Sequence, residues 1–122
     1  MVFVVTGDRE IIRRTTSPII QSTKKYLSGS DRLAGAISSI DCEVVVNVQG
    51  DEPFIDKTLL ERITQEITTS QVDVVSAAFP IDDVADIENP SNVKVYFDND
   101  GLATEFTRTP IGADQQYQHI GV

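Results

Sequence analysis

Three consecutive valines, Val44, Val45 and Val46, run directly into a polar segment at residues 47–53 (Asn-Val-Gln-Gly-Asp-Glu-Pro), and this junction constrains the fold most. A β-branched run predicts a buried strand, and the Gly-Asp and Glu-Pro steps predict that it ends in a turn. We therefore expect a central strand over residues 44–49. Such a strand delivers the side chains that follow it to the carboxyl edge of a sheet, where open α/β sheets bind ligands.

Strand and helix patterns alternate along the rest of the chain. Strand-like runs occupy residues 2–6, 18–21, 72–79, 93–97, 103–107 and 118–122. Helical spacing of apolar side chains occupies residues 9–15, 31–40 and 56–67, with one further turn starting at Asp82 or Asp83. This order predicts an α/β layered sheet, mostly parallel with an antiparallel portion.

Capping and turn residues set the predicted boundaries of these elements. Ser30 and Asp56 are expected to cap the second and third helices by accepting bonds from first-turn amides. Pro80 is expected to stop the strand before it. Residues 98–101 (Asp-Asn-Asp-Gly) predict a hairpin turn in which Gly101 takes the positive φ.

Composition narrows the class of protein. The 122 residues suffice for one domain, and 19 acidic against 10 basic residues give a net charge of −9, which argues against a nucleic-acid surface. No apolar run approaches the ~20 residues of a membrane helix, and no basic-then-apolar leader is present. A single cysteine fits a reducing compartment. We therefore expect no membrane partner and a cytoplasmic location.

The predicted turn is also the best candidate for a binding site. Asp51 follows the central strand, and the side chain of Gln49 is expected on the same face of that strand. Glu52 and Asp56 add negative charge, which is costly at one sheet edge unless a cation binds there. A carboxylate in this place suits Mg²⁺ bridging the phosphates of a nucleotide. The alternative is that Asp51 merely caps the turn.

Residues 47–53 resemble the signature of the 3-deoxy-manno-octulosonate (Kdo) cytidylyltransferases, the CMP-Kdo synthetase family. Further segments resemble that family in the same order, namely residues 28–33 (Ser-Gly-Ser-Asp-Arg-Leu), 93–95 (Val-Lys-Val), 106–111 (Phe-Thr-Arg-Thr-Pro-Ile) and 119–122 (His-Ile-Gly-Val). The resemblance implies a Rossmann-like nucleotide-diphospho-sugar transferase fold, truncated at both ends. Residues 1–122 would then be the central portion of a single nucleotidyltransferase domain.

The resemblance also implies a reaction. Asp51 resembles the aspartate that holds Mg²⁺ against the phosphates of CTP, which makes it the catalytic and metal-binding residue. The anomeric hydroxyl of Kdo would attack the α-phosphorus of CTP and release pyrophosphate, a step of lipopolysaccharide biosynthesis. Such a step depends mainly on positioning and on electrostatic stabilisation by metal and cations.

The other implied roles concern the two substrates. The residues that resemble the family's grip on the sugar acid are Gln49, Arg108 and His119, of which the arginine suits a carboxylate. The residues that resemble its contact with the cytidine half are Ser28, Gly29 and Arg32. Each keeps a simpler alternative: Arg108 as a surface ion-pair residue, His119 as a satisfied strand histidine and Arg32 as a shield for a helix face.

Two other functions remain open at this point. One is a sibling sugar cytidylyltransferase of the CMP-sialic acid synthetase type, which shares the fold and the metal chemistry. The other is a non-catalytic remnant or assembly module. The family's phosphate-binding loop and second metal aspartate have no counterpart in residues 1–122, so we expect the isolated chain to be weakly active or inactive. A homodimer is a further expectation.

Overall fold

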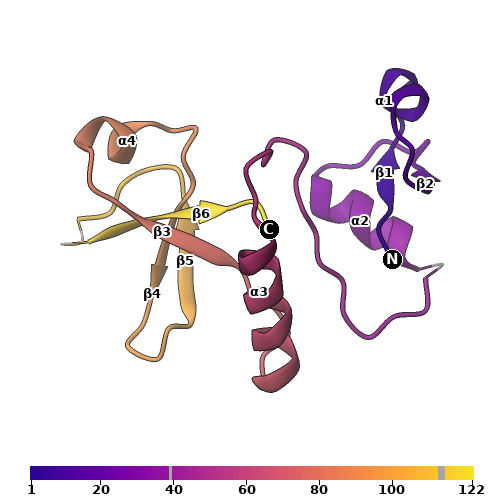
Figure 1. Ribbon diagram of the computed structural model, residues 1–122. Coiled ribbons are helices and arrows are strands. Elements are labelled where there is room, and N and C mark those ends of the chain that lie inside the picture. The colour runs from indigo at the N-terminus through magenta and orange to yellow at the C-terminus, as the bar shows by residue number, and fades with distance from the viewer. Residues whose placement is uncertain (39, 113–114) are drawn as a thin grey trace. The chain divides into compact units, whose positions relative to one another are not determined.

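The computed structural model describes residues 1–38, 40–112 and 115–122, which divide into two compact units, Met1–Val45 and Val46–Val122. Each unit has its own small sheet and its own helices (Figure 1). None of the helices in these described ranges has the length and apolar character needed to cross a membrane.

The first unit is a parallel strand pair with two helices. Its elements are β1 (Val4–Thr6), α1 (Arg9–Arg14), β2 (Ile19–Gln21) and α2 (Gly29–Ile37). β1 and β2 pair in parallel, with Val5 opposite Ile20. α2 contacts β1 and contributes Ala36 to the small buried core of this unit.

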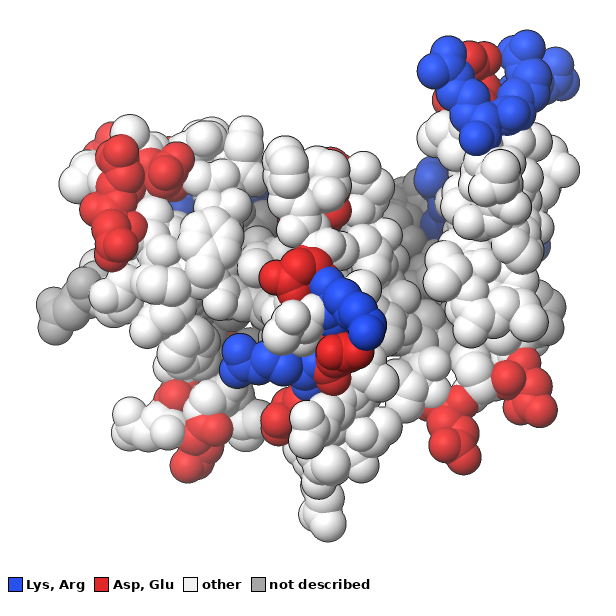
Figure 2. Space-filling model, in the orientation of Figure 1, with Lys and Arg blue, Asp and Glu red and all other residues white. Residues whose placement is uncertain are grey.

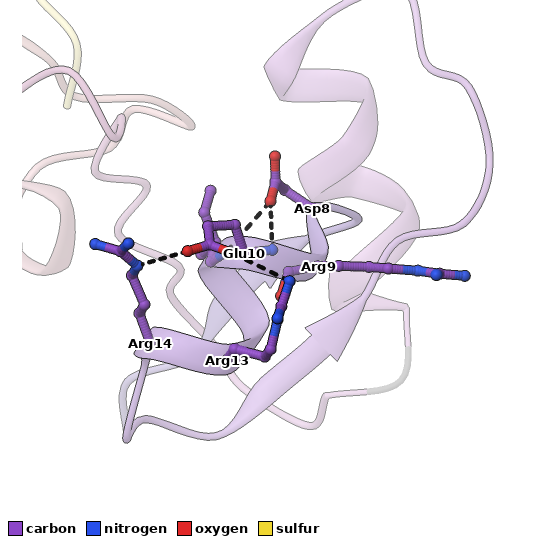
Figure 3. Close-up of polar contacts among 6 residues, drawn as sticks. Asp8, Arg9, Glu10, Arg13 and Arg14 are labelled. Atoms are coloured by element: carbon purple, nitrogen blue, oxygen red, sulfur yellow. Dashed lines mark hydrogen bonds and ion pairs between the residues drawn. The ribbon is translucent and has the colours of Figure 1, made fainter.

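Helix α1 is held by polar contacts at both ends (Figure 3). The Asp8 carboxylate accepts a bond of 2.7 Å from the Glu10 amide and so caps the start of the helix. The Glu10 carboxylate pairs with Arg13 at 3.1 Å and with Arg14 at 2.9 Å. Because these ion pairs are exposed, each stabilises the helix by only ~0–1 kcal/mol. The basic side chains gather over α1 in Figure 2.

The second unit is an antiparallel sheet with two helices. Its elements are α3 (Lys57–Thr69), β3 (Ala77–Ile81), α4 (Val84–Glu88), β4 (Lys94–Phe97), β5 (Ala103–Thr107) and β6 (Gln116–Ile120). The strand order is β3-β6-β4-β5, and every neighbouring pair is antiparallel. Acidic side chains gather over α4 on the face drawn in Figure 2.

Local signals set most boundaries in this unit. Asp56 accepts a bond of 2.8 Å from the Leu59 amide and caps α3, and Asp83 caps α4 in the same way. Ile63 is the buried residue of α3. Gly101 has φ 82° in the β4–β5 hairpin, a conformation in which only glycine avoids a steric cost. These predictions are confirmed.

The predicted α/β class is confirmed, with parallel and antiparallel pairing both present, but their balance differs from the prediction. Among the described strands one pair is parallel and three are antiparallel. The predicted central strand over residues 44–49 is wrong, because this segment is neither helix nor strand. Within the described ranges its one backbone hydrogen bond outside the turn runs from Gln49 to Gly121, and a strand needs a continuous partner.

Three predicted boundaries also need correction, the first being the start of the strand predicted over residues 72–79, since β3 begins only at Ala77. Pro80 does not stop the preceding strand but lies within β3, opposite Tyr117. β3 is an edge strand, where a residue without an N–H can be accommodated. The cap of α2 is Ser28 and not Ser30, since Ser28 Oγ accepts a bond of 3.1 Å from the Asp31 amide.

Candidate functional site

The turn after residue 48 is joined to the end of β6 through the main chain of Gly121. The Gln49 amide donates to the Gly121 carbonyl at 2.9 Å. The Gly121 amide donates to Glu52 Oε1 at 2.9 Å, and the Glu52 amide closes the turn on the Gln49 carbonyl at 3.1 Å. Gln49 is thereby fixed near His119, two residues before Gly121. These bonds bring together two of the residues predicted to bind the sugar acid.

His119 is half-buried in β6 and contacts residues far from it in sequence. Its Nε2 lies 2.7 Å from Ser76 Oγ. Its ring meets the ring of Phe106 edge-on, with centroids 5.3 Å apart and planes at 87°. Burial lowers the pKa of His119 below its ordinary value of 6.5, while the carboxylate of Glu52 opposes that shift. The neutral form of the imidazole therefore predominates at pH 7.

A groove of about 240 Å³ lies beside this histidine. The segment leading into α3 contributes Glu52 and Asp56, the first turn of α3 contributes Leu59, and the sheet contributes Phe79 and residues 118–120. The wall thus combines apolar side chains with a few polar groups, as small-molecule sites do. A second hollow of about 410 Å³ follows the surface of α3 and contains none of the predicted site residues.

Asp51 lies in the turn with an exposed side chain. Among the described residues its carboxylate has no hydrogen bond or ion pair, whereas the neighbouring Glu52 is bonded to Gly121. The described ranges contain no cluster of three or more acidic, histidine or cysteine side chains that would hold a metal by itself. A lone free carboxylate fits Mg²⁺, which protein sites bind through one or two carboxylates together with phosphates and water.

Arg108 follows β5 and is tied to the loop after α4. Its Nη1 donates to the carbonyls of Pro90 at 2.7 Å and Ser91 at 3.2 Å. A guanidinium has five N–H donors, and among the described residues those on Nε and Nη2 have no acceptor. These donors can therefore bind a carboxylate.

Lys94 of β4 supports the same loop from inside. Its side chain has 0% exposure, and Nζ donates to the carbonyls of Asn89 at 2.6 Å and Arg108 at 3.3 Å. Lys94 and Arg108 thus both donate to carbonyl groups of the loop at residues 89–91, and Lys94 also donates to the carbonyl of Arg108 itself. These bonds fix the backbone that carries Arg108.

The predicted cytidine-contacting residues belong to the first unit. Ser28 caps α2 and also donates its hydroxyl to the Asp31 carboxylate at 2.8 Å. Gly29 is the first residue of α2, and Arg32 follows one turn later with an exposed side chain. These residues form an exposed helix start within their own unit.

Sequence reasoning missed Ser76 and Lys94 as parts of the site and treated Glu52 only as extra charge. Ser76 lies 43 residues from His119, and only the pairing of β3 with β6 brings them together. For Lys94 a signal existed: it is the one charged residue in the apolar run at 93–97. A lysine within a strand pattern on a buried face needs a partner.

Replacing Gly121 with alanine should displace the Gln49 side chain. A Cβ at this position would lie 2.8 Å from Gln49 Cδ and 3.0 Å from Cγ, which is too close. Because a glutamine side chain can move, we expect a cost of about 1 kcal/mol in unfolding free energy, at the low end for overpacking. Urea unfolding and the NMR position of the Gln49 side-chain amide would measure both effects.

Gly50→Ala is the matched control, since a Cβ there meets nothing within 4 Å and its φ is not positive. A Gly121→Ala protein with unchanged stability and an unmoved Gln49 amide would contradict the described packing.

Comparison with known proteins places this geometry in a family. Residues 8–120 match the cytidylyltransferase family. The 3-deoxy-manno-octulosonate cytidylyltransferase of Christiangramia forsetii is 38% identical over 99% of this chain and 54% of its own length. The enzyme of the same name from Flavobacterium johnsoniae is 37% identical over 99% of this chain and 55% of its own. An 8-amino-3,8-dideoxy-manno-octulosonate cytidylyltransferase of Shewanella baltica is 31% identical, with 99% and 55% covered.

A solved structure gives the same result. The structure of CMP:2-keto-3-deoxy-manno-octonic acid synthetase complexed with CTP superposes with a TM-score of 0.84 at 26% identity, covering 98% of this chain and 53% of that one. The chain spans about half the length of the relatives it matches. The resemblance inferred from the sequence motifs is confirmed. On the match over residues 8–120, the chain belongs to the cytidylyltransferase family.

Proposed function

We propose that this chain acts in the transfer of CMP from CTP to 3-deoxy-manno-octulosonate, with release of pyrophosphate. The observation that carries the proposal is the turn at residues 49–52, which is bonded to Gly121, two residues after His119, beside a groove lined by Glu52 and His119. The proposal is supported by relatives named for this activity and by the similarity to a synthetase structure with CTP.

The sugar acid would be held by three side chains of the second unit. Arg108 would receive its carboxylate on Nε and Nη2, because Nη1 is already bonded to the carbonyls of Pro90 and Ser91. Gln49 and the neutral imidazole of His119 would receive hydroxyl groups. On the nucleotide side, Ser28, Gly29 and Arg32 would contact the cytidine half.

In the reaction, the anomeric oxygen of the sugar acid forms a bond to the α-phosphorus of CTP, the bond from that phosphorus to the pyrophosphate oxygen breaks, and the hydroxyl proton is released to solvent. Asp51 would hold Mg²⁺, which when bound neutralises the phosphate charge that develops. The protein residues orient the sugar acid so that its hydroxyl lies in line with the leaving group. Such positioning is the larger part of catalysis in phosphoryl transfer.

We further propose that residues 1–122 are the central portion of one nucleotidyltransferase domain and that the protein acts in the cytoplasm, with a homodimer as its assembly. The match of nearly the whole chain to about half of each relative supports the first part. Under this proposal turnover by residues 1–122 alone would be about 10³ to 10⁵ lower than that of the complete domain, which is the rate effect of removing cationic groups in phosphoryl transfer.

Ligand binding tests the function without requiring turnover. The chain has one histidine, so ¹⁵N-histidine labelling gives a single imidazole, and titration with Kdo should shift it. Gln49→Ala should weaken that response about tenfold, the effect of losing about one hydrogen bond to the ligand. Gln65→Ala, an exposed glutamine of α3, is the matched control and should leave the titration unchanged.

Two further ligands separate the alternatives. A sialic acid that shifts His119 at lower concentration than Kdo would favour the sibling enzyme. Calorimetric titration with CTP and Mg²⁺ should release heat, and no heat at millimolar ligand together with no response to either sugar acid would favour the non-catalytic module.

A further inference from the structure

The hydroxyl group of Ser76 lies between a ring nitrogen and a main-chain oxygen. Ser76 Oγ is 2.7 Å from His119 Nε2 and 2.7 Å from the Val122 oxygen, with the Ile120 carbonyl farther away at 3.5 Å. Ser76 immediately precedes β3, and the pairing of Ala77 with Ile120 holds it against the end of β6. The three groups are therefore held in place by the sheet itself.

Counting protons assigns the direction of each bond. A serine hydroxyl has one hydrogen, and the Val122 oxygen can only accept, so this hydrogen lies between Oγ and Val122. Oγ must then accept from His119, which requires a hydrogen on Nε2. A neutral imidazole carries one N–H, so Nδ1 has a free lone pair. The opposite assignment would place two acceptors 2.7 Å apart without a hydrogen between them.

The surroundings of His119 agree with a neutral ring. The Phe106 ring packs edge-on against it, and burial lowers its pKa. Among the described residues Nδ1 has no hydrogen-bond partner. The nearby Glu52 carboxylate has no hydrogen bond to the ring among the described residues, and its Oε1 accepts from the Gly121 amide. His119 also lines the groove of the candidate site.

We infer that Ser76 is a positioning residue that locks His119 in the Nε2–H tautomer, so that Nδ1 accepts a hydrogen bond from a hydroxyl group of the substrate. The identity of that substrate as a sugar acid rests on the proposed function. An unprotonated nitrogen cannot bind a carboxylate, which can only accept. The carboxylate of the substrate is therefore directed to Arg108, and His119 selects for a hydroxyl group instead.

The tautomer is measurable in the protein without any ligand. With ¹⁵N-histidine, the single imidazole should show a protonated Nε2 and an unprotonated Nδ1 at pH 7.5. In Ser76→Ala the ratio of the Nε2–H to the Nδ1–H tautomer should fall by about tenfold, towards the ratio found for free histidine, because the hydrogen bond that fixes the tautomer is gone. Ser76→Thr retains the hydroxyl and should retain the tautomer.

Ser70→Ala is the matched control. This variant also removes a hydroxyl group that donates to a main-chain carbonyl, that of Glu66 at 2.7 Å, and Ser70 lies outside the site. It should leave both ring signals unchanged, which separates tautomer control from a general loss of stability.

The outcomes for the inference and for the proposed function are distinct. A protonated Nδ1 in the free protein, or the same tautomer in Ser76→Ala as in the parent, would overturn the inference whatever the protein's activity. The expected tautomer with no movement of the Nδ1 signal on addition of Kdo would refute the hydroxyl contact and count against the sugar acid as substrate. Movement of Nδ1 with Nε2–H retained supports both.

Discussion

On the proposed function, replacing Asp51 with asparagine should lower the rate of CMP transfer by at least about 100-fold. Residues that merely support metal ligands already change affinity or activity by about 10–100-fold, so loss of a direct ligand should exceed that range. Asparagine keeps the size of the side chain and removes its charge. Since the Asp51 carboxylate has no hydrogen bond among the described residues, the fold should be unaffected. Because turnover by residues 1–122 is expected to be low, pyrophosphate release with CTP, Mg²⁺ and Kdo would be followed at high protein concentration to measure the rate, and urea unfolding would measure the stability.

Asp73→Asn is the matched control for that experiment. Asp73 is also exposed in the second unit and has no hydrogen bond or ion pair among the described residues. The variant makes the same change in net charge, but at a residue outside the turn at residues 49–52. If both variants lost activity equally, the effect would be one of overall charge and the assignment of Asp51 as metal ligand would be wrong.

The largest effect on stability is expected at Lys94. Lys94→Met keeps the length of the side chain but removes the ammonium group that bonds the Asn89 and Arg108 carbonyls. Each of these two part-buried bonds has a charged donor and is worth about 1.5–3 kcal/mol, while relief from burying a charge offsets part of this. We expect the unfolding free energy to fall by about 2–4 kcal/mol, read from the urea midpoint at constant slope.

Lys57→Met on α3 is the control for this substitution. Lys57 is exposed and forms one ion pair with Glu61 at 3.2 Å, which is worth only about 0.3–0.5 kcal/mol between helix residues four apart. A stability loss for Lys94→Met no greater than that for Lys57→Met would show that the buried ammonium group does not hold the loop.

Local signals in the sequence predicted the helices and the hairpin because their causes are local. The carboxylates of Asp56 and Asp83 bond amides two or three residues away, and Gly101 takes the positive φ its turn requires. The prediction for residues 44–49 failed for the opposite reason. Three valines favour a strand, but a strand also needs a partner, and partners are set by distant parts of the chain.

In the candidate site, too, residues with a local sequence signal are predicted and a residue that depends on distant pairing is not. Gln49, Asp51, Arg108 and His119 are predicted as site residues because they stand in motifs of a recognisable family. Ser76, which bonds His119, has no such signal, because its role depends on the register between β3 and β6. The sequence therefore predicts which groups bind substrate, and the structure shows which neighbouring groups contact them.

The position of the divalent ion tests the account most directly. Mn²⁺ can replace Mg²⁺ as a hard, oxygen-binding ion, and its unpaired electrons broaden the NMR signals of nearby nuclei. With CTP present, the amides of residues 50–52 should broaden first, and Asp51→Asn should abolish this while Asp73→Asn should not. Broadening centred on the acidic residues around α4, or unchanged in Asp51→Asn, would contradict a metal site at this turn.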